Sequence, residues 1–125
     1  MNSTIRSMML MLAMVGVGAC AHKPLACPNL NSSDVAPAMG AGVAIQPVFA
    51  ASSVKGWRIY NVRNSDQLKA QGIGDGSMLT QVCGVPVRDI HAKGGAICCR
   101  ADVSREFEVT IDVAGQEKKF MIRRP

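Results

Sequence analysis

A short uncharged run near the N-terminus decides how much of this chain is left to fold. Residues 8–19 are all apolar or glycine, and the only charge before them is Arg6. A membrane-spanning helix needs about 20 apolar residues, so this run is too short to cross a bilayer and is typical of the core of a secretory signal peptide. We therefore expect residues 1–19 to be removed and the rest of the 125-residue chain to form one domain.

The end of that run, Val17-Gly18-Ala19-Cys20, resembles the lipobox of bacterial lipoproteins. The resemblance implies that Cys20 is lipidated and becomes the new N-terminus. It also implies sorting to the outer membrane, because Ala21 stands where an aspartate would signal retention. The expected location is the periplasmic side of the cell envelope, with membrane contact through the lipid. A soluble secreted protein that happens to carry Cys20 is the alternative.

The rest of the chain is mildly basic and poor in aromatic residues. Removal of residues 1–19 takes away one of the 14 Lys and Arg residues and none of the nine acidic ones, so the net charge falls from +5 to +4. No zinc-finger or helix-turn-helix spacing occurs, and no aromatic interleaving suits single-stranded nucleic acid, so a nucleic-acid partner is not expected. A basic cluster near the C-terminus is typical of the solvated face of a strand. It comprises Lys118, Lys119, Arg123 and Arg124.

The four cysteines beyond the lipobox would meet an oxidising compartment after export. A bond between the adjacent residues Cys98 and Cys99 would be strained, so Cys27 is expected to pair with one of them and Cys83 with the other. Free buried thiols and a metal site are the alternatives. Neither Cys-x-x-Cys nor Cys/His spacing is present, so no metal and no cofactor are expected.

The composition changes at residue 43. Residues 20–42 are rich in Pro, Ser, Ala, Gly and Asn without apolar periodicity, which predicts a flexible tether, and the domain is expected over 43–125. Pro47 moves the first strand toward the edge of a sheet. Strands are expected over 43–50, 55–62, 77–84 and 85–87, followed by a hairpin over 106–124 that turns at 114–116.

Two helices are expected between these strands. The first covers residues 64–72, with Asn64 as its cap and Gly72 as its end, and a weaker one has room within 89–103. The glycines at 72, 74 and 76 follow a helix and precede a strand. A phosphate-binding loop needs the opposite order, so these glycines are interpreted as a turn.

On these residues the chain resembles a bacterial PDZ domain, most closely that of the C component of type II secretion systems. The resemblance covers residues 43–124 and is clearest in the segments Gly56-Trp57-Arg58-Ile59, Gly72-Ile73 and Cys83-Gly84-Val85. It implies an α+β fold, a compact and partly open β-barrel of five to six strands with two short helices. Cys83 replaces the Asn that is usual in the family, and the second helix contains Gly94-Gly95 and Cys98-Cys99.

The resemblance also implies a peptide groove. In such a groove the extended C-terminus of a partner pairs with the edge of strand 56–62, and backbone amides before the strand hold its carboxylate. Carried over by position, the carboxylate loop is Lys55-Gly56-Trp57-Arg58, to which Lys55 or Arg58 could add charge. Ile59 and Ile97 are candidates for lining the groove, and each is equally plausible as core.

The expected function is binding without catalysis. His22 and His91 have no arrangement of Ser and Asp around them that would suit nucleophilic chemistry. The prediction is an outer-membrane lipoprotein that binds a peptide or protein as an accessory or adaptor in type II secretion. Its partner would be a secretion component or an exported protein. A structural envelope lipoprotein with a degenerate groove and a regulator of a periplasmic protease are the alternatives.

Overall fold

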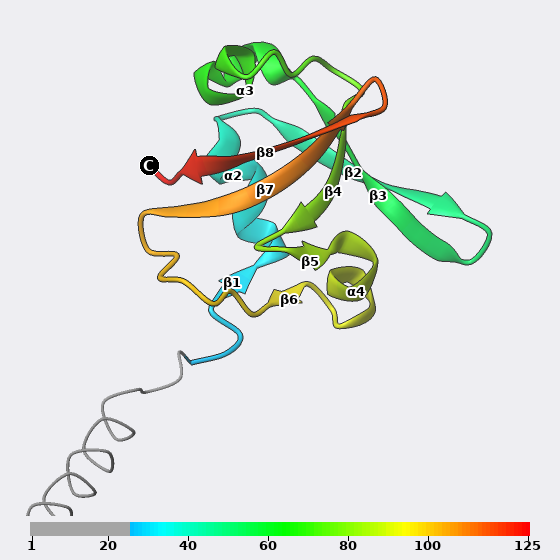
Figure 1. Ribbon diagram of the computed structural model, residues 1–125, viewed down its shortest axis with the longest axis vertical. Helices are drawn as coiled ribbons and strands as arrows, with labels where there is room; N and C mark the ends of the chain where they lie inside the picture. The colour runs from blue at the N-terminus through cyan, green and yellow to red at the C-terminus, as the bar shows by residue number, and fades with distance from the viewer. Residues whose placement is uncertain (1–25) are drawn as a thin grey trace, which may run out of the picture.

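The computed structural model describes residues 26–125, shown as a ribbon in Figure 1. The predicted signal peptide, the lipidation site Cys20 and the first part of the predicted tether lie outside the described residues. Within the described part of the chain, no helix is long and apolar enough to cross a membrane.

The fold is built on an antiparallel sheet with the spatial order β2-β3-β4-β7-β8. A short strand, β5, pairs with the end of β4 beside this path. The fold class is α+β, as predicted from the sequence, with an open sheet and few, short helices. The strands are β2 (Ala44–Ala50), β3 (Ser53–Tyr60), β4 (Met78–Val82), β5 (Val85–Pro86), β7 (Glu106–Val113) and β8 (Gln116–Arg123).

Short helices surround this sheet, and a second, two-stranded sheet lies at its base. The helix α2 packs against β8, and α4 packs against β3, β4 and β5. Figure 1 shows α3 above the outer strand β8 and the β2–β3 hairpin projecting from the body. The remaining elements are β1 (Leu30–Asn31), η1 (Ser32–Asp34), α2 (Val35–Met39), η2 (Val62–Asn64), α3 (Asp66–Ala70), α4 (Val87–Ala92) and β6 (Ala96–Ile97).

The hairpin of β7 and β8 supplies much of the core, as its alternation predicts. Phe107, Val109 and Ile111 point inward from β7, and Ile122 is buried opposite them on β8. Each such side chain contributes about 1.5–3 kcal/mol when it is fully removed from water. The turn lies between Val113 and residue 116, as expected, so the register of the two strands places both apolar faces on the same side.

The predicted tether is wrong for residues 30–42. These residues form β1, η1 and α2, and Val35, Ala38 and Met39 are buried in the core. Their spacing is that of one face of a helix, but a stripe confined to a single turn beside Pro37 gives no visible periodicity. The helical start is also marked locally, since Asn31 and Asp34 form a reciprocal capping box. The folded domain therefore includes residues well before 43.

Both predicted helices are shorter than expected. The first, α3, is capped by Ser65, whose hydroxyl accepts the amide hydrogen of Leu68 at 3.2 Å, and not by Asn64. The second prediction, over 89–103, is wrong beyond α4. Gly94 and Gly95 have φ values of 72° and 95°, which end the helix, and β6 begins directly after them.

Candidate functional site

The strand that was predicted to receive a partner, β3, lies inside the sheet. It pairs along its length with β2 on one side and, through Trp57 and Arg58, with β4 on the other. The amide of Ile59 donates to Ser77, and its carbonyl accepts the amide of Gly76. Both sides of this strand are occupied, so the prediction that a peptide pairs with the edge of residues 56–62 is wrong.

The residues assigned to the predicted groove are mostly core residues. A Cβ on Gly56 would lie 2.6 Å from Cγ of Met78 and 3.1 Å from the carbonyl oxygen of Leu79, which explains why only glycine fits there. Ile59 and Ile97 are fully buried. Close packing of β3 against β4 therefore accounts for the Gly-aromatic-Arg-aliphatic pattern without a ligand.

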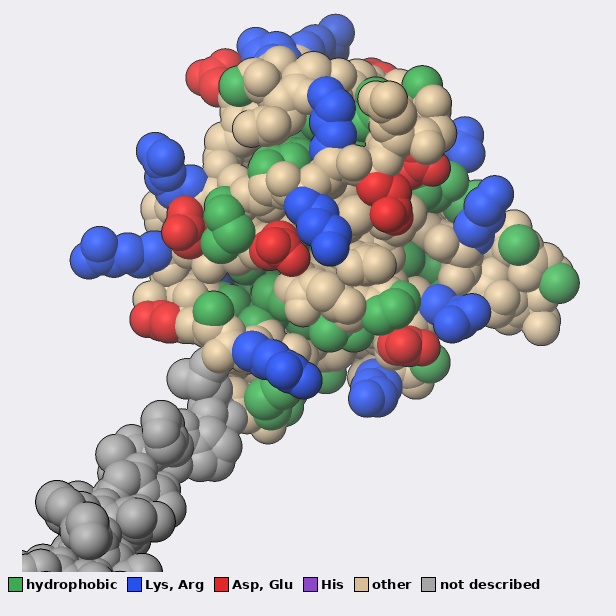
Figure 2. Space-filling model, viewed as in Figure 1, with side chains coloured by type: hydrophobic (Ala, Val, Ile, Leu, Met, Phe, Trp, Pro, Cys, Tyr) green, Lys and Arg blue, Asp and Glu red, His purple; other side chains and the backbone are tan. Residues whose placement is uncertain are grey.

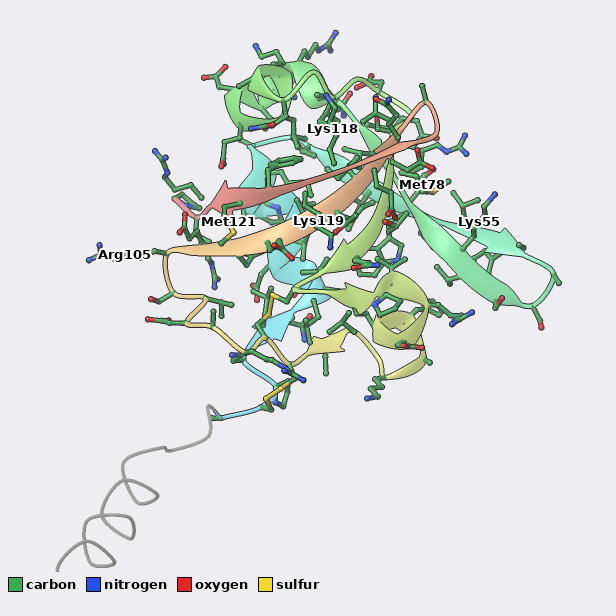
Figure 3. The ribbon with its side chains drawn as sticks, in the orientation of Figure 1. Lys55, Met78, Arg105, Lys118, Lys119 and Met121 are labelled. Carbon is green, nitrogen blue, oxygen red and sulfur yellow. A yellow bond between two sulfur atoms is a disulfide. The ribbon has the colours of Figure 1, made fainter. Side chains whose placement is uncertain are left out.

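The other predicted groove residues are divided between the surface and the core. Lys55 is exposed on the projecting hairpin, away from Lys119 and Met121, as Figure 3 shows. Arg58 is half-buried, and its Nε has no hydrogen-bond partner among the described residues. Trp57 is 5% exposed. Of the predicted set, only Trp57 lines a hollow that opens beside a free strand edge, as described below.

The free edge belongs to β2. Successive residues of a strand direct their peptide groups to opposite sides. The N–H and C=O of Ile59 point away from β2, toward the β4 side, so those of the preceding residue, Arg58, point toward β2. Gln46, which lies opposite Arg58, therefore points its own N–H and C=O toward β3. Ile45 and Pro47 therefore direct their peptide groups to the outer side of β2, where no strand pairs with it in the described part of the chain.

Pro47 shapes what this edge can offer. Proline has no N–H, and at an outward position it removes no hydrogen bond from the ladder with β3. Ile45 offers both a donor and an acceptor, whereas Pro47 offers only its carbonyl. A bulge between Val48 and Phe49 interrupts the regular register just beyond it. The open edge is thus short and richer in acceptors than in donors.

A hollow of about 300 Å³ lies beside this edge. One side is formed by Ile45 and Pro47 of β2 with Trp57 of β3, and the other by residues of η1, α2 and α4. The ring of Phe49, which is 56% exposed, meets the ring of His91 edge-on with the centroids 5.8 Å apart. The residues of the far side are Ser32, Ser33, Ala36 and His91.

The loop of residues 40–43 leads into β2 and lies at the end of the open edge. In this loop the amide of Gly40 donates a hydrogen bond to the carbonyl of Ala36, and the amide of Val43 donates one to the carbonyl of Gly40. Ala41 and Gly42 are exposed, and their amides form no hydrogen bond within residues 26–125. Two donors are therefore available beside the point where an added antiparallel strand would end.

The opposite edge of the sheet, on β8, is covered. The side chain of Gln67 on α3 accepts the amide hydrogen of Arg123 at 2.6 Å and donates to the carbonyl of Arg123 at 2.9 Å. Because Arg124 bonds to Arg105 beside β7, alternation places the peptide groups of Lys119 on the outer side as well. A larger hollow of about 890 Å³ lies between α2, α3 and this strand.

Two disulfides join the base of the fold. They link Cys27 to Cys98 and Cys83 to Cys99, with Cα atoms 5.1 and 5.3 Å apart. The prediction that Cys27 pairs with one of the two adjacent cysteines and Cys83 with the other is confirmed, and of the two arrangements left open the structure has the crossed one. Among residues 26–125, no group of three or more His, Cys, Asp or Glu side chains is placed to hold a metal ion.

Charge does not single out another site on the face that Figure 2 shows, where basic and acidic side chains are interspersed. No protein-family model and no curated protein sequence matches the chain. Among solved structures, the chain is similar to the PDZ domain of EpsC from Vibrio cholerae, with 18% sequence identity and a TM-score of 0.49. The alignment covers 65% of this chain and 92% of that one. This is the kind of domain that the sequence itself resembles.

Proposed function

We propose that this protein captures an extended segment of a partner protein by adding it as a strand to the outer edge of β2. One observation carries the proposal: Ile45 and Pro47 direct peptide groups outward from an edge strand, next to a hollow whose walls are largely apolar. Main-chain hydrogen bonds then give affinity, and side-chain pockets give selectivity. The activity is binding without a chemical step.

The geometry favours an antiparallel segment with a free C-terminus. Such a segment would exchange two hydrogen bonds with Ile45 and donate one to Pro47. Residues directly opposite each other in an antiparallel pair share a face, so alternate side chains of the segment would enter the hollow beside Trp57. Its carboxylate would then lie near the free amides of Ala41 and Gly42, which are suited to an anion.

The cellular setting of the proposal is the periplasmic side of the outer membrane. The lipobox-like sequence ending at Cys20 supports lipid anchoring, and two disulfides suit an oxidising compartment. The resemblance of residues 55–87 to the C component of type II secretion systems supports a role as an accessory or adaptor in that pathway. The partner would then be a secretion component or an exported protein.

Photocrosslinking in cells tests the proposal. A photoreactive phenylalanine analogue in place of Phe49 puts the probe on the exposed outer part of β2 in the full-length protein. We expect covalent adducts with one or a few envelope proteins, identified by mass spectrometry. Ile45→Pro should lower the adduct yield at least tenfold, because it deletes the outward donor and leaves the ladder to β3 intact.

Lys119→Pro is the matched control, since it places the same ring at an outward position of the opposite edge strand. It should leave the adduct yield unchanged. Equal loss with both variants, or adducts that survive Ile45→Pro, would rule out capture at β2. Adducts with lipid alone would favour a structural envelope lipoprotein, and a protease as the main adduct would favour the regulatory alternative.

A further inference from the structure

Most of the far wall of the hollow beside β2, here called the β2 groove, belongs to the N-terminal segment of the domain, and His91 of α4 supplies the rest. Ser32 and Ser33 of η1 and Ala36 of α2 line the hollow across from Ile45 and Pro47. Ser32 also lines a second hollow of about 280 Å³ that continues past His91. The width of the groove on this side therefore depends on how firmly the segment is held.

Residues 26–34 are held through the short β1–β6 pair, which joins Leu30 to Ile97 and Asn31 to Ala96, and through a few hydrogen bonds around it. The amide of Asn29 donates to Ile97 at 3.1 Å, and that of Ser32 donates to Gly95 at 2.8 Å. The side chain of Asn29 forms bonds of 2.7 and 2.8 Å with the amide and carbonyl of Cys99. Leu30 is the one buried apolar residue in this range. The disulfide to Cys98 adds a covalent link at the start of this segment.

The helix α2 is held independently. Val35 and Met39 are almost completely buried, and Ser65 bonds to the carbonyl of Met39. Loss of the disulfide would therefore loosen the segment up to η1, which only the β1–β6 pair and its hydrogen bonds would then hold, and leave the helix in place. Only the Ser32 and Ser33 part of the groove wall would move.

The two disulfides differ in how far solvent reaches them. Cys27 and Cys98 are both exposed, whereas Cys99 is 1% exposed and Cys83 packs partly buried against the core. A thiolate must reach a sulfur atom to reduce a disulfide, so access decides which bond reacts first. The exposed bond is the one that holds the groove wall.

We infer that the Cys27–Cys98 disulfide is a redox control on the β2 groove, an inference that rests on the proposed function. The reductant is a dithiol, small or carried by another protein. One of its thiolates attacks the Cys27–Cys98 bond and forms a mixed disulfide while the other cysteine leaves as a thiolate. The second thiol of the reductant then displaces the remaining cysteine. Two electrons and two protons pass to Cys27 and Cys98, and the reductant becomes its own disulfide.

Reduction lowers the affinity of the groove for its partner. The oxidised wall is already ordered when the partner arrives, whereas the reduced wall must be ordered during binding, at a cost in entropy. We expect capture to fall about threefold to tenfold. The bond between Cys83 and Cys99 keeps the base of the fold joined to β4, so the change is local.

Stepwise reduction tests the control on the protein itself. The full-length chain, purified in detergent, is titrated with dithiothreitol, its free thiols are alkylated and located by mass spectrometry, and amide hydrogen exchange is followed. Cys27 and Cys98 should be labelled first, and exchange at Asn29 and Ser32 should rise at least tenfold while Val109 in β7 stays protected. Earlier labelling of Cys83 and Cys99, or unchanged exchange at Asn29 and Ser32, would overturn the inference.

Two double variants test whether loss of the Cys27–Cys98 disulfide lowers partner capture. Cys27→Ser with Cys98→Ser should retain a cooperative thermal transition and lower the adduct yield from position 49 threefold to tenfold. Cys83→Ser with Cys99→Ser is the matched control: where it still folds, its adduct yield should remain within twofold of the unmodified protein. Unchanged yield in the first pair, while the probe-bearing protein with its native cysteines still forms adducts, overturns the redox control and leaves the proposed function standing. Absence of adducts from the probe-bearing protein with its native cysteines overturns both.

Discussion

The two edge strands of the sheet differ in charge and in how their outer peptide groups are used. Strand β8 carries four charged side chains, and Gln67 forms hydrogen bonds with the peptide groups of Arg123. Strand β2 carries no charge, and its outward peptide groups are unpaired in the described part of the chain. Exposed sheet edges attract other strands, and proteins commonly blunt them with charges, proline or a covering element. The edge on β8 is covered at Arg123, whereas the edge on β2 is only restricted in the length of strand that it can pair with.

The limitation on β2 is specific. Pro47 and the bulge after Val48 leave one residue, Ile45, that both donates and accepts, so a long strand cannot pair along the whole edge. A short segment would still meet the donor and acceptor of Ile45 and the carbonyl of Pro47. Proline on β2 thus limits the length of strand that this edge can pair with and does not close the edge.

The largest effect expected concerns the position of β3 between these edges. Gly56→Trp should strongly destabilise the domain, because even a Cβ at this position meets Met78 and the carbonyl oxygen of Leu79. Overpacking typically costs about 1–3 kcal/mol of unfolding free energy, and a whole indole should reach or exceed the top of that range. Circular dichroism during urea unfolding measures it. Gly74→Ala is the control, since no atom lies within 4 Å of a Cβ there. A variant that kept its stability and lost only partner capture would instead support the sequence-based prediction that residue 56 belongs to a carboxylate-binding loop.

A smaller effect is expected at the covered edge. Gln67→Ala removes the two bonds to Arg123 and a third, of 3.2 Å, to the carbonyl of Ala38. The partners are partly exposed, so the loss of unfolding free energy should be about 1–2 kcal/mol. Urea unfolding measures the loss, and size-exclusion chromatography at rising concentration detects self-association through β8. Gln71→Ala, which retains the backbone carbonyl that Lys118 uses, should change neither.

The smallest effect is expected at the open edge, where Pro47 is the residue that lacks an outward donor. Pro47→Ala restores an outward donor in the middle of β2, and one more hydrogen bond should raise the adduct yield from position 49 about threefold. Stability should fall by up to about 1 kcal/mol, since the unfolded chain gains freedom. Pro86→Ala in β5 is the matched control and should leave the adduct yield as it was. A lower yield with Pro47→Ala would mean that the partner does not pair with this position.

Sequence reasoning is most successful where side chains alternate regularly. The β7–β8 hairpin follows from residues such as Phe107, Val109 and Ile111, because burial on one face fixes both strand and register. The adjacency of Cys98 and Cys99 predicts that each pairs with a distant cysteine, but it does not select between the two possible arrangements. Pro47 alone is enough to predict that β2 is an edge strand, because proline cannot donate to a neighbour on both sides.

The strand predicted to offer a free edge, β3, is an inner strand, and the free edge belongs to its neighbour β2. A motif such as Gly56-Trp57-Arg58-Ile59 identifies a close-packed strand, but it does not say which neighbours that strand has, since strand order is set by contacts distant in sequence. The far wall of the groove escapes prediction for a related reason. The four buried residues within 30–39 are covered by the rest of the fold, with β1 paired to β6 and α2 packed against β8, and so short a segment has no periodicity of its own.

The paired cysteines at 98 and 99 also define how the domain would carry a mechanical load. A pull on the chain before Cys27 enters the domain through a covalent bond to Cys98 and passes through one peptide unit to Cys99 and on to Cys83, beside the end of β4. The short β1–β6 pair lies off this path. Tension applied on the N-terminal side of Cys27 would therefore reach the central sheet without first shearing the two-residue β1–β6 pair.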